Sequence, residues 1–279
     1  MATRQSTAKK KGVATTKKDQ LPALANQFDA DASAGFEEAD QQAYAIPFLA
    51  VLQSGSPQCK RSEGEYIKGA EEGMFFNSAD EEIYDGQDVG IDVIPVHYRR
   101  VFVEWKPRDT GGGFIAEHSA EDGEHLLTQC EIDEKNCRVL PNGNHLVDTR
   151  VHYCMMYTED GDVTPVVICM TSTQIKKSRK WMTVMRQLKM TRQDGTAFNP
   201  PMFSHVYHLS TVPESNDKGA WMGYKVETGD VVNNMDHYQA AKQFRDSIVK
   251  GLVKATYEEQ VASGQEEGAA EDDGEYEEF

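Results

Sequence analysis

Aromatic rings and cations alternate between Tyr98 and Arg108. The residues concerned are Tyr98, Arg99, Arg100, Phe102, Trp105, Lys106 and Arg108. Single-stranded nucleic acid is bound by this mixture, because bases stack on rings while cations lie against phosphates. Alternation along a strand puts Tyr98, Arg100 and Phe102 on one face. The segment therefore predicts a nucleic-acid-binding face. The alternative is that Phe102 and Trp105 are core residues and the arginines are ordinary surface residues.

A second basic segment runs from Lys176 to Arg192. It contains seven Lys and Arg residues, and no acidic residue occurs from Val163 to Gln193 in a chain with 46 acids and 29 bases. At about 100° per residue, Ile175, Trp181 and Met185 fall on one half of a helical wheel and the cations on the other. An acid-free helix in so acidic a chain indicates an anionic partner, with an ordinary solvated helix face as the alternative. The cations expected to hold phosphates are Lys176, Lys177, Arg179, Lys180 and Arg186.

The net charge of −17 is unevenly distributed along the chain. Residues 1–18 carry six bases and no acid, whereas residues 258–279 carry ten acids and no base. The body between them is also acidic, so any nucleic-acid surface must be local. The acidic end, which terminates in Phe279, is either a solubility tail or a functional one that mimics a nucleic-acid strand or docks its terminal ring into a partner.

Composition and periodicity predict three parts. Residues 1–45 are a disordered basic arm and linker, 46–257 are a β-rich core, and 258–279 are a disordered acidic tail. Within the core, Ile91–Trp105 is the longest strand candidate, and Pro95 indicates an edge position or a bulge. The polar region 117–144 is expected to be rich in turns. The fold class is therefore mainly β with two helices, a β-rich α+β protein; the helices are the basic segment and a last one at about 234–257.

No motif typical of an enzyme is present. The sequence has no phosphate loop, Gly-x-Ser-x-Gly or His-Glu-x-x-His, so we expect neither catalysis nor a cofactor. Acidic pairs in turns could hold a metal ion, so a metal-dependent nuclease remains the least favoured of the functional hypotheses. The Cys and His residues lack the Cys-x₂-Cys spacing common in structural zinc sites, and no metal is expected. Whether they bind one is left open; they are Cys130, Cys137, His145, His152 and Cys154.

The sequence also indicates a compartment. Five Cys, an odd number scattered through the chain, fit reduced thiols. No apolar run reaches the length of a membrane span, and the N-terminus lacks the hydrophobic segment of a secretory signal. We therefore expect a cytoplasmic protein, in the host cytoplasm if it is viral, with no membrane partner. A homo-oligomer is left open.

The chain resembles bacteriophage single-stranded DNA-binding proteins of the replication and recombination type. The resemblance rests on the β-rich core, the segment 171–181 and the acidic tail ending in Phe279. The short segments 47–49 and 102–105 also look similar to uncharacterised phage proteins found among such genes. It implies an oligonucleotide-binding (OB) fold, a five-stranded Greek-key barrel with a helix between strands, here with embellishments because the chain is longer than one barrel needs. It also implies that the tail recruits replication proteins and competes with DNA.

These observations predict a sequence-tolerant single-stranded DNA-binding protein that acts in phage replication or recombination. Its partners would be single-stranded DNA and, through the tail and Phe279, replication or recombination proteins. The alternative from another class is a phage interaction protein, either a host-directed inhibitor or a DNA mimic, whose acidic surface is the active part.

Overall fold

The computed structural model describes residues 46–134, 136–217, 219–253, 255 and 257, with Phe28, Asp31, Ala34 and Gly35. The chain divides into two units, Met1–Ala43 and Tyr44–Phe279, and the described helices and strands lie in the second. Apart from those four residues, the expected arm lies outside the described part. The expected acidic tail, 258–279, lies outside it entirely.

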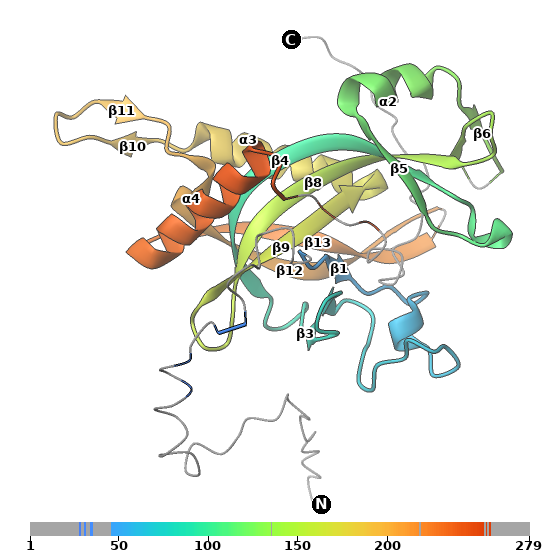
Figure 1. Ribbon diagram of the computed structural model, residues 1–279, viewed down its shortest axis with the longest axis horizontal. Coiled ribbons are helices and arrows are strands. Elements are labelled where there is room, and N and C mark those ends of the chain that lie inside the picture. The colour runs from blue at the N-terminus through green and yellow to red at the C-terminus, as the bar shows by residue number, and fades with distance from the viewer. Residues whose placement is uncertain are drawn as a thin grey trace, which may run out of the picture. The chain divides into compact units, whose positions relative to one another are not determined.

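An antiparallel sheet of eight strands forms the centre of this unit (Figure 1). Its neighbouring long strands lie in the order β13-β12-β4-β8-β9. Strands β4, β8 and β9 follow one another, and β12 returns beside β4, which is the strand order of a Greek key. The long strands are β4 (Ile91–Trp105), β8 (His145–Tyr157), β9 (Val163–Thr171), β12 (His205–Asn216) and β13 (Gly219–Val231). The connection from β4 to β8 contains β5 (Phe114–Ser119), β6 (Glu131–Ile132) and β7 (Arg138–Val139).

Strand β4 is the strand that the sequence predicted, with the same bounds. Its pairing with β8 shifts register between Pro95 and His97, so Pro95 marks a bulge. Proline lacks the N–H that a regular ladder uses, which explains why the irregularity occurs there. Pairing with β12 extends only over Ile91–Val93. Beyond the bulge, β4 therefore leaves β12 and runs on alongside β8.

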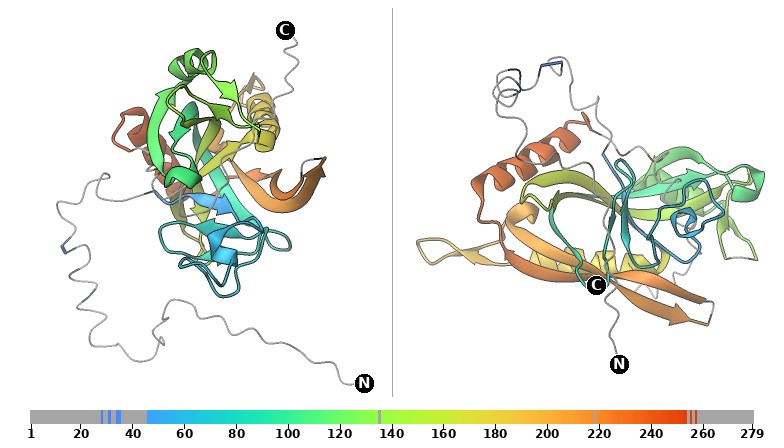
Figure 2. Two further views of the ribbon diagram at one scale, coloured as in Figure 1. Left: turned by 90° about the vertical axis from the view of Figure 1, so that its right-hand side faces the viewer. Right: turned by 90° about the horizontal axis from the view of Figure 1, so that it is seen from below.

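A small sheet closes the open side of the curled large sheet. It contains β1 (Leu49–Val51), β2 (Phe75–Asn77) and β3 (Ile83–Tyr84). The Val167 N–H donates to the Pro47 carbonyl at 2.8 Å, which holds the start of β1 beside β9. On the other side, the Gln53 amide bonds both the N–H and the carbonyl of Met222 in β13. Seen from below, the long strands curve round into a half-barrel (Figure 2).

Two helices pack on opposite faces of the large sheet. Trp181 and Met185 of α3 (Ile175–Gln187) join the apolar cluster inside the curl, with Ile168 and Tyr207. On the outer face lies α4 (Met235–Val249), whose Ala241, Phe244 and Ile248 contact the β4–β8–β9 surface. Alternate residues of each strand face the two clusters, as the period of a strand requires.

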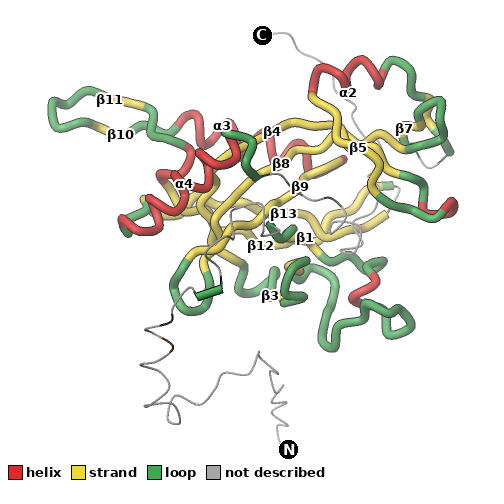
Figure 3. Tube along the Cα trace, in the orientation of Figure 1, coloured by secondary structure: helices red, strands yellow, loops and turns green. Residues whose placement is uncertain are grey.

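The prediction of a mainly β protein is confirmed, and the prediction of only two helices is wrong: the described chain contains three α-helices (Figure 3). The extra helix, α2 (Ala120–Leu127), lies in the region expected to be turns. Ser119 caps its N-terminus by accepting from the Asp122 N–H, and Leu126 and Leu127 pack over Phe102. The described residues also include four short 3₁₀ turns: η1 (Pro57–Cys59), η2 (Arg108–Thr110), η3 (Ser172–Gln174) and η4 (Met202–Ser204).

The basic helix is shorter than the basic segment. It ends at Gln187, and a two-stranded ribbon follows, made of β10 (Met190–Thr191) and β11 (Ala197–Phe198). Lys189 and Arg192 therefore belong to the ribbon. None of the helices in the described part of the chain combines the length and the apolar character that crossing a bilayer requires. The OB assignment itself stays a prediction.

Candidate nucleic-acid interface

The outer face of α3 is a stripe of cations. Lys176, Arg179, Lys180 and Arg186 are all exposed, at spacings that place them on one side of the helix. Within the described residues, none of the four forms a salt bridge. Cations without an acidic partner are available to phosphates at no cost of breaking an ion pair. The stripe is therefore a surface suited to an anionic strand.

Lys177 differs from its neighbours. Its ammonium group pairs with Glu214 at the end of β12. The same carboxylate accepts hydrogen bonds from Gln174 Nε2 at 3.2 Å and Trp221 Nε1 at 3.0 Å. Lys177 therefore fixes the start of α3 to the β12–β13 ribbon, and its charge is already balanced.

The buried face of α3 is held by β8. Trp181 is 2 % exposed and stacks on the His152 ring, with centroids 4.6 Å apart. His152 Nε2 lies 2.8 Å from Ser178 Oγ, so one histidine contacts two residues of the helix. Burial, with a smaller contribution from the nearby Arg150 charge, lowers the pKa of His152 to about 3. The histidine is therefore neutral near pH 7, and the buried face of α3 packs against an uncharged imidazole.

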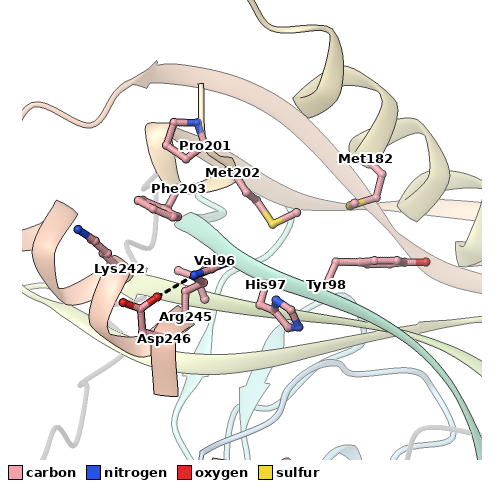
Figure 4. A pocket seen from close by; sticks show the side chains of 10 residues that line it. All are labelled: Val96, His97, Tyr98, Met182, Pro201, Met202, Phe203, Lys242, Arg245 and Asp246. Carbon is pink, nitrogen blue, oxygen red and sulfur yellow. Dashed lines mark hydrogen bonds and ion pairs between the residues drawn. The ribbon is translucent and has the colours of Figure 1, made fainter. Parts of the chain in front are cut away.

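A groove of about 510 Å³ lies between α3 and α4, at the edge of β4 that β12 has left (Figure 4). Met182 comes from α3, and Lys242 and Arg245 come from α4. The ring and apolar residues between them are His97, Tyr98, Met202 and Phe203. Arg245 also pairs with the neighbouring Asp246 at 2.8 Å. Rings and cations line this one groove, and single-stranded nucleic acid is bound by such a mixture.

Tyr98 is fixed from behind. Its hydroxyl accepts from Arg150 Nη1 at 3.3 Å, and Arg150 in turn donates to Asp148 at 3.0 Å. The Tyr98 ring also leans on His152, with centroids 5.2 Å apart. A ring held in this way loses little freedom when a base stacks on it, which favours binding.

The other β4 cations are already paired. Arg100 donates to Asp148 at 2.9 Å and also contacts Glu124. Arg99 points to the opposite face of the sheet and donates to Glu117 at 2.9 Å. Each carboxylate balances a charge that the sequence had assigned to phosphates.

Phe102 and Trp105 are core residues in this structure. Phe102 is 0 % exposed, beneath α2, and Trp105 is 9 % exposed. The Trp105 ring contacts Phe114 and Tyr257, with centroids at 6.0 and 6.3 Å. The structure thus matches the alternative that the sequence left open for these two rings, because neither has a face open to a base.

Lys106 and Arg108 lie elsewhere. Both are exposed, after the far end of β4. At about 3.3 Å per residue, the seven residue steps from Tyr98 to Trp105 put them roughly 20 Å or more along β4 from the groove. The fold therefore separates the expected continuous track. It brings Tyr98 to the α3 side and leaves Lys106 and Arg108 at a distance from the groove.

A family model described as Pam3 phage gp34-like protein matches residues 13–254. The chain belongs to this phage protein family. No curated protein and no solved structure matches the chain. The matched range contains α3, the groove and the whole curled sheet, and it stops short of the acidic residues 258–279.

Four residues of the groove were not predicted as site residues from the sequence: Met182, Phe203, Lys242 and Arg245. Lys242 and Arg245 stand three apart on α4, a spacing that marks one helix face. That signal was available, but nothing in it shows that α4 meets α3 across β4. Only the bulge at Pro95 and the departure of β12 open the space between the two helices.

The Cys and His residues considered for a metal do not form a site in the described structure. His152 and Cys154 are fully buried in β8, and burial raises the pKa of the Cys154 thiol, so it stays protonated. No group of three or more His, Cys, Asp or Glu residues in the described ranges is placed to hold a metal ion.

Proposed function

We propose that this phage protein binds single-stranded DNA without sequence preference, along the outer face of α3 and the groove beside it, during phage replication or recombination. The observation that carries the proposal is the stripe of four unpaired cations on α3 next to a groove containing Tyr98 and Phe203. Phosphates would lie against the helix and bases would stack in the groove. Because the rest of the body is acidic, it repels phosphates, and DNA is attracted only to the α3 cations and the groove beside them.

The strand order supports an OB-like barrel as the scaffold for this activity. Strands β13-β12-β4-β8-β9 with α3 between β9 and β12 fit a five-stranded Greek-key barrel with one helix between strands. Elements beyond that set are the embellishments that the length of the chain implied. They are the β1–β3 sheet, α4, and the elements within the β4–β8 connection.

The direct test is charge reversal on α3. The variant Lys176→Glu, Arg179→Glu, Lys180→Glu should bind a labelled single-stranded oligonucleotide far more weakly than the wild type. Four neutralised phosphates predict that log K falls against log salt with a slope of about −3 in the wild type, from roughly −0.7 per contact. Fluorescence anisotropy at several salt concentrations measures both quantities.

A matched control variant has the same net charge as the α3 triple variant but keeps the α3 cations. Lys60, Arg61 and Lys68 are exposed residues around η1. Reversing these three to Glu changes the total charge equally but should leave oligonucleotide affinity nearly unaltered. Equal losses in the two triple variants would mean that only net charge matters. Full affinity in the α3 variant would remove the helix from the binding site.

The acidic residues 258–279 complete the proposal, although they lie outside the described part of the chain. Ten carboxylates tethered to the same chain act at an effective concentration in about the millimolar range and would compete with DNA for the α3 cations. Removing 258–279 should tighten DNA binding most at low salt, where screening is weak. Removing only Phe279 should leave DNA affinity unchanged and weaken a replication or recombination protein that receives the ring. Equal affinity of full and truncated chains at low salt would leave the tail with a solubility role only.

The same assay separates the alternative functions. A host-directed inhibitor or DNA mimic predicts no salt-dependent oligonucleotide binding at all. A nuclease predicts that the oligonucleotide disappears when Mg²⁺ is added, whereas a non-enzymatic binding protein leaves it intact.

A further inference from the structure

The ribbon made of β10 and β11 projects beyond the C-terminal end of α3 (Figure 1). Its turn is closed by the Arg192 N–H donating to the Thr196 carbonyl at 2.8 Å. Inside the turn, the Asp194 carboxylate accepts from the Thr196 N–H at 2.9 Å and its hydroxyl at 2.7 Å. The only acid of the ribbon is thus engaged within the turn, and Lys189 and Arg192 give the ribbon its outward charge.

One face of the ribbon carries a ring and a cation together. Met190 and Phe198 are directly opposite each other across the two strands. The guanidinium carbon of Arg192 lies 4.7 Å from the centre of the Phe198 ring. Met190 and Phe198 are partly exposed and Arg192 is exposed, and neither apolar residue belongs to the buried clusters. A small β-ribbon gains little stability from apolar side chains held outside the core, so this face is suited to a partner.

The ribbon is tied to the basic helix. Asn199 Nδ2 donates to the carbonyl of Arg186 at 2.6 Å and lies 3.4 Å from that of Leu188. The Asn199 side-chain oxygen accepts from Lys189 Nζ at 2.5 Å. These bonds connect the base of the ribbon to the last turn of α3. A strand held on α3 would therefore be led towards the Phe198 face.

We propose that this face packs on the end of a duplex, so that the preferred ligand is a junction between single-stranded and double-stranded DNA. This inference rests on the proposed function, because α3 must hold the single-stranded part. The last base pair of a duplex presents a flat π surface that Phe198 and Met190 can cover. Arg192 would then reach the adjoining backbone phosphates, and its contact with the ring keeps it in place for this.

The test compares three labelled probes with the full-length protein: a single strand, a blunt duplex, and a duplex carrying a single-stranded overhang as long as the single-strand probe. The wild type should bind the junction about tenfold more tightly than the single strand, which is within the range of one stacking contact. A 2-aminopurine in the terminal base pair should change its fluorescence when the protein binds. The double variant Phe198→Ala, Arg192→Ala should lose both effects and keep its affinity for the single strand.

Two controls keep the outcome clear. Gln193→Ala alters an exposed residue of the same turn and should behave as the wild type. Arg192→Glu alone keeps the ring and should weaken junction binding more at low salt than at high salt. Thermal melting should be unchanged in every variant, because the ribbon lies outside the buried clusters.

The results distinguish this inference from the proposed function. Equal affinity of the wild type for junction and single strand would overturn the junction inference and leave single-strand binding in place. So would an equal loss on both probes in the Phe198 double variant, which would make the ribbon part of the single-strand site. A change in sedimentation in that variant would instead identify the face as a contact between copies of the chain. No binding to any probe would overturn the proposed function itself.

Discussion

The outer face of α3 and the inner face of β4 carry similar residues in different surroundings. On α3, Lys176, Arg179, Lys180 and Arg186 extend into solvent without an acidic partner in the described chain. On β4, Arg100 meets Asp148 and Glu124, and Phe102 is covered by α2. In sequence both segments are mixtures of cations and apolar or aromatic residues. A cation is therefore available to a phosphate only where the fold places no carboxylate opposite it.

Tyr98 is the exception on β4, because it joins the two regions. It lies in the groove with Met182 of α3, and Arg150 and His152 hold it from behind. The strand has already begun to separate from β12 at this point, so the ring is not covered by a neighbouring strand. One strand therefore contributes a core ring at Phe102 and a groove ring at Tyr98.

Removing either ring should change a different quantity, and the change in stability at Phe102 should be the larger one. Phe102→Ala should lower the free energy of unfolding by about 3–5 kcal/mol, because it removes a fully buried ring against which Gly123 of α2 packs. Its affinity for single-stranded DNA, measured on the folded fraction, should be unchanged. Tyr98→Ala should instead weaken DNA binding by about 1–3 kcal/mol.

Chemical denaturation and anisotropy on both variants test the contrast. If Tyr98→Ala reduces only stability, the groove does not hold a base. If Phe102→Ala reduces affinity as much as Tyr98→Ala does, the separation of the two rings into core and site is wrong.

A second effect, of about 2 kcal/mol in the free energy of unfolding, concerns His152, which contacts both α3 and β4. His152 is in contact with Tyr98, Ser178 and Trp181, and burial lowers its pKa from 6.5 to about 3. As pH falls below 6.5, His152 becomes protonated in the unfolded chain, whereas in the folded chain it stays neutral until about pH 3. Stability from this group is therefore complete above about pH 6.5 and declines between 6.5 and 3, by about 2 kcal/mol at pH 5.

Unfolding curves at pH 7 and pH 5 measure this decline. In His152→Gln the difference between the two pH values should shrink, although the variant is less stable at pH 7. His208→Gln is the matched control, because His208 is 38 % exposed and forms an exposed pair with Asp92. An undiminished pH difference in His152→Gln would show that other groups cause the acid sensitivity.

The smallest difference that we predict concerns one cation on α3 and one on β4. Lys180→Ala removes an unpaired cation from α3 and should make the salt slope of DNA binding shallower by about 0.7. Arg99→Ala removes a cation already paired with Glu117 and should leave the slope unchanged. Salt titrations of both single variants provide the measurement, and equal slopes for the two would contradict the distinction between paired and unpaired cations.

Local elements with strong periodicity could be predicted from the amino-acid sequence. The bounds of β4 follow from its β-branched and aromatic run, and the bulge follows from Pro95. The apolar stripe of Ile175, Trp181 and Met185 gave α3, because a helix face is set by neighbours three and four residues apart. Helix α2 escaped prediction because it is eight residues long and has Gly123 at its centre.

Which residues of those elements form the candidate site depends on how distant segments pack together. Arg100 and Asp148 are 48 positions apart, and they meet because β4 and β8 pair in one register. Likewise, Lys242 reaches the groove because α4 packs across β4. Local sequence patterns carry no record of such long-range pairing. The physical reason is that periodicity reflects near neighbours along the chain, whereas the availability of a charge or a ring depends on whatever distant segment lies against it.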